Sequence, residues 1–113
     1  MITKQKDMVV TAKEHMRGGE GTVHLTSLCA ELPAHMRLFS RIVLEKGESI
    51  GYQVHENETE LFYFVQGTAE VRDDDAVYTL TAGDSMATSS GHGHGVKNIG
   101  EDTLVLVAAI VLD

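Results

Sequence analysis

Two short blocks of the sequence hold the residues whose types and spacing can do chemistry. The first block carries Gln53, His55 and Glu60, and the second, which is rich in glycine, carries His92 and His94. Two imidazoles, a carboxylate and a side-chain amide at one point form a ligand set that suits a divalent transition metal with open coordination positions. The two blocks therefore predict a metal site, and they leave any reaction undefined.

The geometry of the first block follows from a predicted β-hairpin. If Asn57-Glu58 forms a two-residue turn, His55 lies directly across from Glu60, with Cβ atoms roughly 5 Å apart on one face. Asparagine suits the positive φ angle that such a turn requires. Alternation along the two strands adds three more side chains to this face, which then runs into an aromatic floor: Gln53, Phe62 and Phe64.

The second block predicts that one strand aims an imidazole at the same interior. Strand alternation gives four of its residues one parity: His92, His94, Val96 and Asn98. Glycines fill the opposite parity at positions 91, 93 and 95, which is typical of a strand whose backbone approaches another element closely.

The elements that must position these residues read as β-strands, because the apolar residues recur with a period of two. Turn-forming clusters separate the expected strands, which are Val23–Thr26, Leu38–Leu44, Ser49–His55, Glu60–Val65, Ala69–Arg72, Val77–Leu80, His92–Lys97 and Thr103–Val111. Strands this short and closely spaced predict an all-β antiparallel sandwich or barrel. We expect at most one helical turn within Thr26–His35, ending at Pro33, and an irregular lead-in or edge strand over roughly the first twenty residues.

Composition narrows the class of protein. The 113 residues suffice for a single domain, and the formal net charge of -8 disfavours binding to nucleic acids or anionic membranes. Cys29 is the only cysteine, so no disulfide forms within the chain. No apolar run has the length of a signal peptide or a membrane helix, and we therefore expect a cytoplasmic protein.

The two blocks resemble the paired motifs of the cupin superfamily. The matching positions are Gly47, His55, Glu60 and Gly67 in the first motif, and Gly83, Gly91, His94 and Asn98 in the second. The resemblance is to small single-domain bacterial cupins with the conserved type 2 barrel. It implies a barrel of the jelly-roll type, also called a double-stranded β-helix, over residues 36–113. It also implies that residues 1–35 form a lead-in and edge strand, and that the protein is a homodimer.

The resemblance further implies one divalent metal ion held by Gln53, His55, Glu60 and His94. Gln53 stands where the first motif has a histidine, and Ser89 replaces the usual proline of the second. Because an amide oxygen is a harder and weaker donor than imidazole, the set favours Mn, Fe or Zn and predicts lower affinity than a three-histidine site. Gln53 is alternatively a hydrogen-bonding neighbour that does not ligate.

Five further residues are candidates for the pocket, namely Phe62, Phe64, Met86, His92 and Arg41. Met86 either lines the pocket or packs in the core, and His92 either restores a third imidazole or lies in a solvated loop. Arg41 either anchors a substrate carboxylate or pairs on the outer face.

Two functional classes stay open from the sequence. The first is a metalloenzyme of dioxygenase, decarboxylase or isomerase type acting on a small oxygenated substrate. The second is a non-catalytic module that binds or senses a small ligand. A fold alone does not choose between them.

Overall fold

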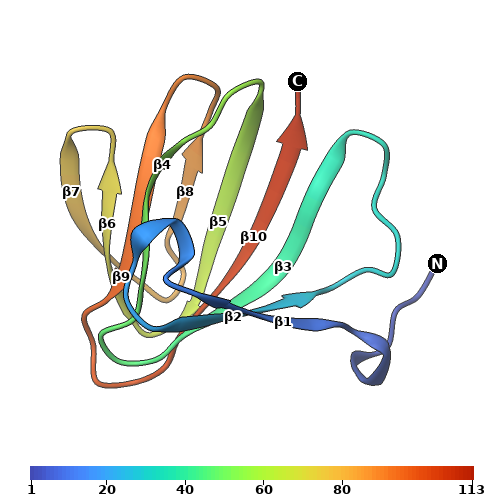
Figure 1. The fold of residues 1–113 in the computed structure, drawn as a ribbon, viewed down its shortest axis with the longest axis horizontal. Helices are drawn as coiled ribbons and strands as arrows, with labels where there is room; N and C mark the ends of the chain where they lie inside the picture. Colours follow the sequence, from blue (N-terminus) through green and yellow to red (C-terminus); the bar gives the residue numbers. More distant parts are fainter.

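The expected all-β architecture is present in the computed structural model, which describes residues 1–113. Ten strands and two short 3-10 turns follow one another along the chain (Figure 1). Their bounds are η1 Gln5–Asp7, β1 Val10–Glu14, η2 Met16–Gly18, β2 Thr22–Ser27, β3 Met36–Leu44, β4 Ser49–Val54, β5 Glu58–Gln66, β6 Thr68–Asp73, β7 Ala76–Thr81, β8 Ser85–Thr88, β9 Gly93–Asn98 and β10 Leu104–Leu112. The chain has no helix of the length and apolar character that a membrane span requires.

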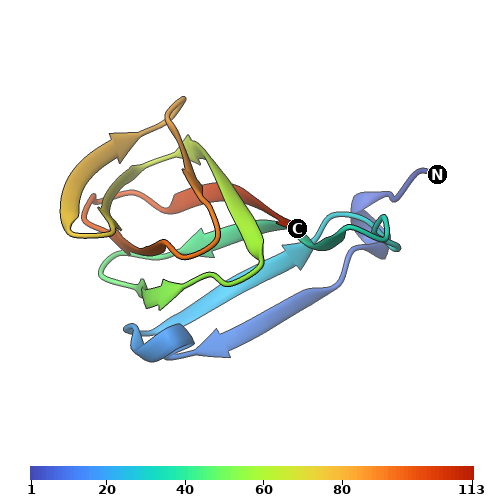
Figure 2. The same ribbon diagram turned by 90° about the horizontal axis from the view of Figure 1, so that it is seen from above.

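The strands form two antiparallel sheets. One has six strands in the order β1-β2-β3-β10-β5-β8, and the other has four in the order β4-β9-β6-β7. Seen from above, the sheets curl around a shared interior, and the N-terminal strands extend the larger sheet at one edge (Figure 2). This arrangement is the double-stranded β-helix that the sequence predicted.

The predicted hairpin in the first block is wrong. β4 pairs with β9 in the smaller sheet, whereas β5 pairs with β10 and β8 in the larger one. The chain therefore crosses between sheets after β4, and Asn57 keeps the predicted positive φ, at 61°, within this crossing. The physical reason is that β10 offers β5 a long apolar partner strand, which local turn chemistry does not reveal.

Three local predictions are resolved by the structure. No helical turn forms between β2 and β3, where the chain is irregular apart from a turn after Pro33. Of the two alternatives for the first twenty residues, the edge strand is present: β1 lies at the edge of the larger sheet, although all five of its residues are exposed and it carries no alternation signal. β8 was not predicted as a strand because it has only four residues, two of which are hydroxylic.

The interior has an apolar part and a polar end. Apolar side chains of both sheets form one core cluster that includes Leu44, Ile50, Phe64, Val71 and Leu106. The polar end buries a separate group: His55, Glu58, Glu60, Thr88 and His94. Every buried side-chain nitrogen and oxygen has a hydrogen-bond partner, as burial of polar groups demands.

The N-terminal segment is fastened to the barrel where η2 crosses β4. A Cβ atom on Gly19 would collide with the backbone of Ser49, and one on Gly51 would collide with the carbonyl of Arg17. Only glycine permits so close an approach of two backbones. Met16 packs against the core beside this crossing, so η2 is held at a fixed place on the barrel.

Candidate metal centre

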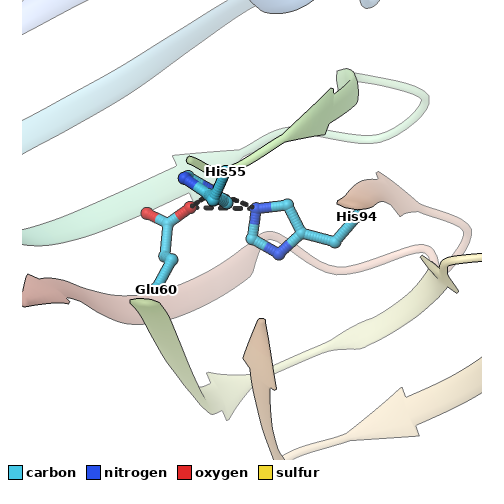
Figure 3. A group of neighbouring side chains, drawn as sticks. All are labelled: His55, Glu60 and His94. Atoms are coloured by element: carbon cyan, nitrogen blue, oxygen red, sulfur yellow. Dashed lines mark hydrogen bonds and ion pairs between the residues drawn. The ribbon is translucent and has the colours of Figure 1, made fainter. Parts of the chain in front are cut away.

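Three side chains from three separate elements meet at the polar end of the interior. His55 directly follows β4, Glu60 lies on β5 and His94 lies on β9, so both sheets contribute. Glu60 Oε1 lies 3.1 Å from His55 Nε2 and 2.9 Å from His94 Nε2, and the two Nε2 atoms are 3.0 Å apart (Figure 3). All three residues are buried, and together they form a group able to hold a metal ion.

The spacing of these three atoms fits an ion bound on one side by ligands at right angles. Metal–nitrogen and metal–oxygen bonds of about 2.1 Å place ligands at right angles about 3.0 Å apart, whereas tetrahedral ligands lie about 3.4 Å apart. The observed separations match the first value. The donor set also fits chemically, because imidazole nitrogens and a carboxylate oxygen are donors that divalent transition metals accept.

Neighbouring side chains hold both imidazoles in place. His55 Nδ1 lies 2.6 Å from Glu58 Oε2, and because a carboxylate only accepts, Nδ1 carries the proton and the Nε2 lone pair faces the centre. His94 Nδ1 lies 2.8 Å from the Thr88 hydroxyl. The ring of Phe62 stacks on the His94 imidazole at a centroid distance of 4.8 Å, so this imidazole is fixed from its face as well.

Glu58 is itself held by Arg37. The Arg37 Nε and Nη2 groups donate to the two Glu58 carboxylate oxygens, both at 2.6 Å. These hydrogen bonds, with a further one from His55, lower the pKa of Glu58 to about 2. Glu58 therefore stays ionised at neutral pH and acts as a fixed anionic support for His55.

Neither Glu58 nor Arg37 was found by sequence reasoning. The predicted Asn57-Glu58 turn leaves Glu58 out of the site, and Arg37 has the strand parity of the outer face. The register of β3 against β10 shifts by one residue between Ile110 and Val111, so Arg37 is the unpaired extra residue of a β-bulge. Bulges re-aim side chains, and this one lets Arg37 reach Glu58.

A small cavity adjoins the group at Glu60, which is the one of the three side chains that lines it. Its polar lining consists of Arg17, Arg37, Gln53 and Glu60, and the remaining lining residues are apolar. Its volume is about 50 Å³. At roughly 10–15 Å³ for each water, this space admits a few water molecules or a ligand of a few non-hydrogen atoms.

The structure places the other predicted site residues as follows. Gln53 pairs with His94 in the β4–β9 register and lines the cavity beside Glu60. Phe62 forms the expected aromatic floor, whereas Phe64 is fully buried below it in the core. Met86 faces inward but packs against the core and borders a different hollow, between β6, β7 and β8.

Two predicted pocket residues do not reach the site. Arg41 is exposed and borders a hollow beside η1, because the register of β3 beyond the bulge points it away from the interior. His92 precedes the first residue of β9, remains half exposed and lies with Nδ1 2.6 Å from Asp74 Oδ2. The expected sharing of one strand face by His92 and His94 is therefore wrong.

Comparison with known proteins places the chain in a family. A family model described as a cupin domain matches residues 40–110. The chain belongs to the cupin family. It is 32% identical to a Thermotoga maritima protein named oxalate-binding protein, over 99% of this cupin and 94% of that relative.

Solved structures agree with the fold of this cupin. A T. maritima crystal structure, described as a predicted oxalate decarboxylase, superposes with a TM-score of 0.94 at 31% identity and covers 100% of both chains. The cupin domain of Schizosaccharomyces pombe Cnp3 superposes with a TM-score of 0.74 at 19% identity, over 80% of this cupin and 61% of that chain. The second likeness concerns the fold alone.

Proposed function

We propose that this cupin holds one divalent transition metal ion at His55, Glu60 and His94 and uses it to bind a small carboxylate such as oxalate. The observation that carries the proposal is the meeting of three metal-ligating atoms within 3.1 Å of one another, next to a cavity. The bound ion supplies a Lewis acid that takes up carboxylate oxygens. The protein supplies the three ligands, their supports and the enclosed space.

The ligand geometry favours an ion that accepts six ligands. Separations near 3.0 Å suit Mn²⁺ or Fe²⁺ in octahedral coordination better than tetrahedral Zn²⁺. Gln53 is the proposed fourth ligand, since its side chain lines the cavity beside Glu60. The open positions on such an ion would face the cavity, where a bidentate ligand binds.

Size and charge of the cavity support a small anion. Its volume of about 50 Å³ excludes ligands as large as a sugar. Two of the four arginines of this acidic chain, Arg17 and Arg37, line it. The name of the T. maritima relative, an oxalate-binding protein that matches along nearly the whole chain, supports the same ligand class.

Turnover of the ligand, for example decarboxylation, is the second candidate function. It is favoured by the 31% identity to the T. maritima structure described as a predicted oxalate decarboxylase. Binding without turnover is preferred because both carboxylates of the site are already committed. Glu60 belongs to the ligand set, and Glu58 has a pKa of about 2 that ill suits a general acid or base at neutral pH.

We further propose that the protein forms a homodimer through the outer face of the larger sheet. Large apolar side chains are exposed on this face from β5 and β10: Leu61, Tyr63, Val65 and Val111. A group of such residues on adjacent strands is typical of a protein–protein interface. Sedimentation analysis of the wild type and of Tyr63→Asp tests this part, and a wild-type monomer would contradict it.

The metal part is tested with a matched pair of histidine variants. We expect His94→Ala to bind Mn²⁺ at least about 100-fold more weakly than the wild type, because a ligand bond is removed. His92→Ala removes an exposed imidazole two residues away and should bind Mn²⁺ like the wild type.

Elemental analysis measures the metal content of both variants, and titration calorimetry measures their Mn²⁺ affinity. Oxalate is then titrated into the Mn²⁺-loaded and the chelator-treated wild type. Unchanged Mn²⁺ affinity in His94→Ala, or equal oxalate binding with and without the ion, would contradict the proposal.

A further inference from the structure

We propose that Arg17, on the N-terminal segment, contacts carboxylate oxygens of the bound ligand that face away from the metal and thereby makes the site selective for dianions. This inference rests on the proposed function and names the ligand class of that site. It assigns a specificity-determining role to a residue outside the barrel strands.

Arg17 is the cationic side chain of the cavity that is free to bind a ligand. The two arginines of the lining differ in their partners: Arg37 is engaged by both carboxylate oxygens of Glu58, whereas Arg17 has no side-chain hydrogen bond or ion pair. Arg17 is exposed and lines the cavity, and a guanidinium offers two parallel donors to a carboxylate, which is the geometry that binds this group most strongly.

The charges around the cavity match a ligand with two negative charges. Taken together, Arg17, Arg37, Glu58 and Glu60 carry two positive and two negative charges, so the group is neutral without a metal. A divalent ion then gives it a net charge of +2. A dianion of a few atoms neutralises this charge, whereas a monoanion of the same size leaves one positive charge in a largely enclosed space.

The backbone holds Arg17 in place at this cavity. Its φ angle of 54° lies in the left-handed region, which is unfavourable for a residue other than glycine. The close crossing of Gly19 and Gly51 fixes the segment there, and Met16 anchors it in the core. Strained conformations of this kind persist where the surrounding structure enforces them, and they concentrate at functional sites.

The position of Arg17 in the sequence supports a specificity role rather than a general one. The cupin-domain match spans residues 40–110 and contains the three candidate metal ligands. Arg17 lies before it, in a segment that the match to the T. maritima oxalate-binding protein does include. Metal binding is therefore assigned to the family barrel, and ligand choice to the segment attached to it.

The test compares oxalate with glycolate on the Mn²⁺-loaded protein. Both molecules chelate a metal through two oxygens and have similar size, but glycolate carries one charge. We expect Arg17→Gln to weaken oxalate binding by about 10- to 100-fold, since a charged hydrogen bond is lost, and to change glycolate binding by less than about threefold. Arg17→Lys should restore part of the oxalate affinity, and Arg41→Gln, which removes an outward-facing arginine, should change neither.

A second variant moves Arg17 without removing its charge. In Gly51→Ala the new methyl group collides with the Arg17 carbonyl, so we expect the same selective loss of oxalate affinity. Gly95→Ala is the control in the neighbouring strand β9, where the methyl group meets its nearest atom at 3.4 Å, an ordinary contact. Thermal melting verifies that both variants fold, and Mn²⁺ affinity should be unchanged in both.

The outcomes separate the two proposals. A wild-type protein that binds Mn²⁺ but neither ligand overturns the proposed function and this inference with it. Normal oxalate binding by the wild type and equally normal binding by Arg17→Gln overturns the inference alone. Equal losses of oxalate and glycolate in Arg17→Gln also overturn it, because the residue would then not distinguish the two charges.

Discussion

The two ends of the barrel interior use the same strands in different ways. β5 shows the contrast along one face, where Glu58 and Glu60 are buried at one end and Phe62 and Phe64 are buried further along. The aromatic residues join a core drawn from both sheets, while the carboxylates join a hydrogen-bonded group. Burial alone therefore does not say what a residue in this barrel is for.

The difference is energetic. Burial of a large apolar side chain stabilises the fold by about 1.5–3 kcal/mol. A buried polar group gains little net free energy from its hydrogen bonds, because it gives up equivalent bonds to water. We infer that the apolar part holds the barrel together and that the polar end is maintained for binding, and this separation of roles is open to test.

The largest expected effect is on the apolar part. Phe64→Ala should destabilise the metal-free protein by about 3–5 kcal/mol, because it leaves a cavity where a fully buried ring was. The Mn²⁺ affinity should stay within about threefold of the wild-type value. Denaturant unfolding in chelator and metal titration calorimetry measure the two quantities. Val77→Ala, at an exposed position of β7, serves as the control. A large loss of Mn²⁺ affinity in Phe64→Ala would show that the two ends are not separate.

The matching change at the polar end is Glu58→Gln. It removes the anionic support of His55 and should weaken Mn²⁺ binding by about 10- to 100-fold, with a much smaller change in the stability of the metal-free protein. Glu56→Gln, at the exposed neighbour, should have no effect on the metal. If Glu58→Gln instead unfolds the protein without affecting the metal, the polar end has a structural role.

A smaller effect is expected at the residue that departs from the family motif. Gln53→His places an imidazole in the cavity lining beside Glu60 and should raise Mn²⁺ affinity by about tenfold if this side chain ligates. Gln66→His, on an exposed position of β5, is the control. Unchanged affinity would assign Gln53 to the ligand cavity and leave the metal with three protein ligands.

The smallest effect concerns the ion pair outside the polar end. The hydrogen bond and charge of Asp74 raise the pKa of His92 above its usual 6.5, and Gly93 and His92 lower the pKa of Asp74. The contribution of the pair should be lost as the pH rises through the raised pKa of His92, and again as it falls through the lowered pKa of Asp74. NMR titration of His92 should show a lower pKa in Asp74→Asn, and an unchanged pKa would show that the two side chains do not form an ion pair in solution.

The fold class and much of the site follow from the sequence because they depend on strand alternation and motif spacing. The meeting of His55, Glu60 and His94 was predicted, and so was the burial of Phe62. The reason given for the first meeting was nonetheless wrong. His55 and Glu60 approach each other across two sheets, because β4 and β5 find partners elsewhere in the chain.

Other features depend on pairing that a single sequence does not reveal. The sequence offers Arg41 as a pocket residue and gives no reason to choose Arg37. Because of one bulge in β3, it is Arg37 that lines the cavity, and Arg41 lies outside it. The segment Arg17-Gly-Gly-Glu-Gly21 resembles the lead-in of small bacterial cupins, but the sequence does not place Arg17 at the cavity, since that place depends on a backbone crossing with β4. Local patterns thus identify residues that face inward, and long-range register decides which of them meet.

The origin of the three candidate ligands in both sheets has a kinetic consequence. His55 and His94 are attached to the smaller sheet and Glu60 to the larger one, so a bound ion would join the sheets as a cross-link. Parting of the sheets would separate Glu60 from the two imidazoles, so a bound ion should slow the opening of the barrel.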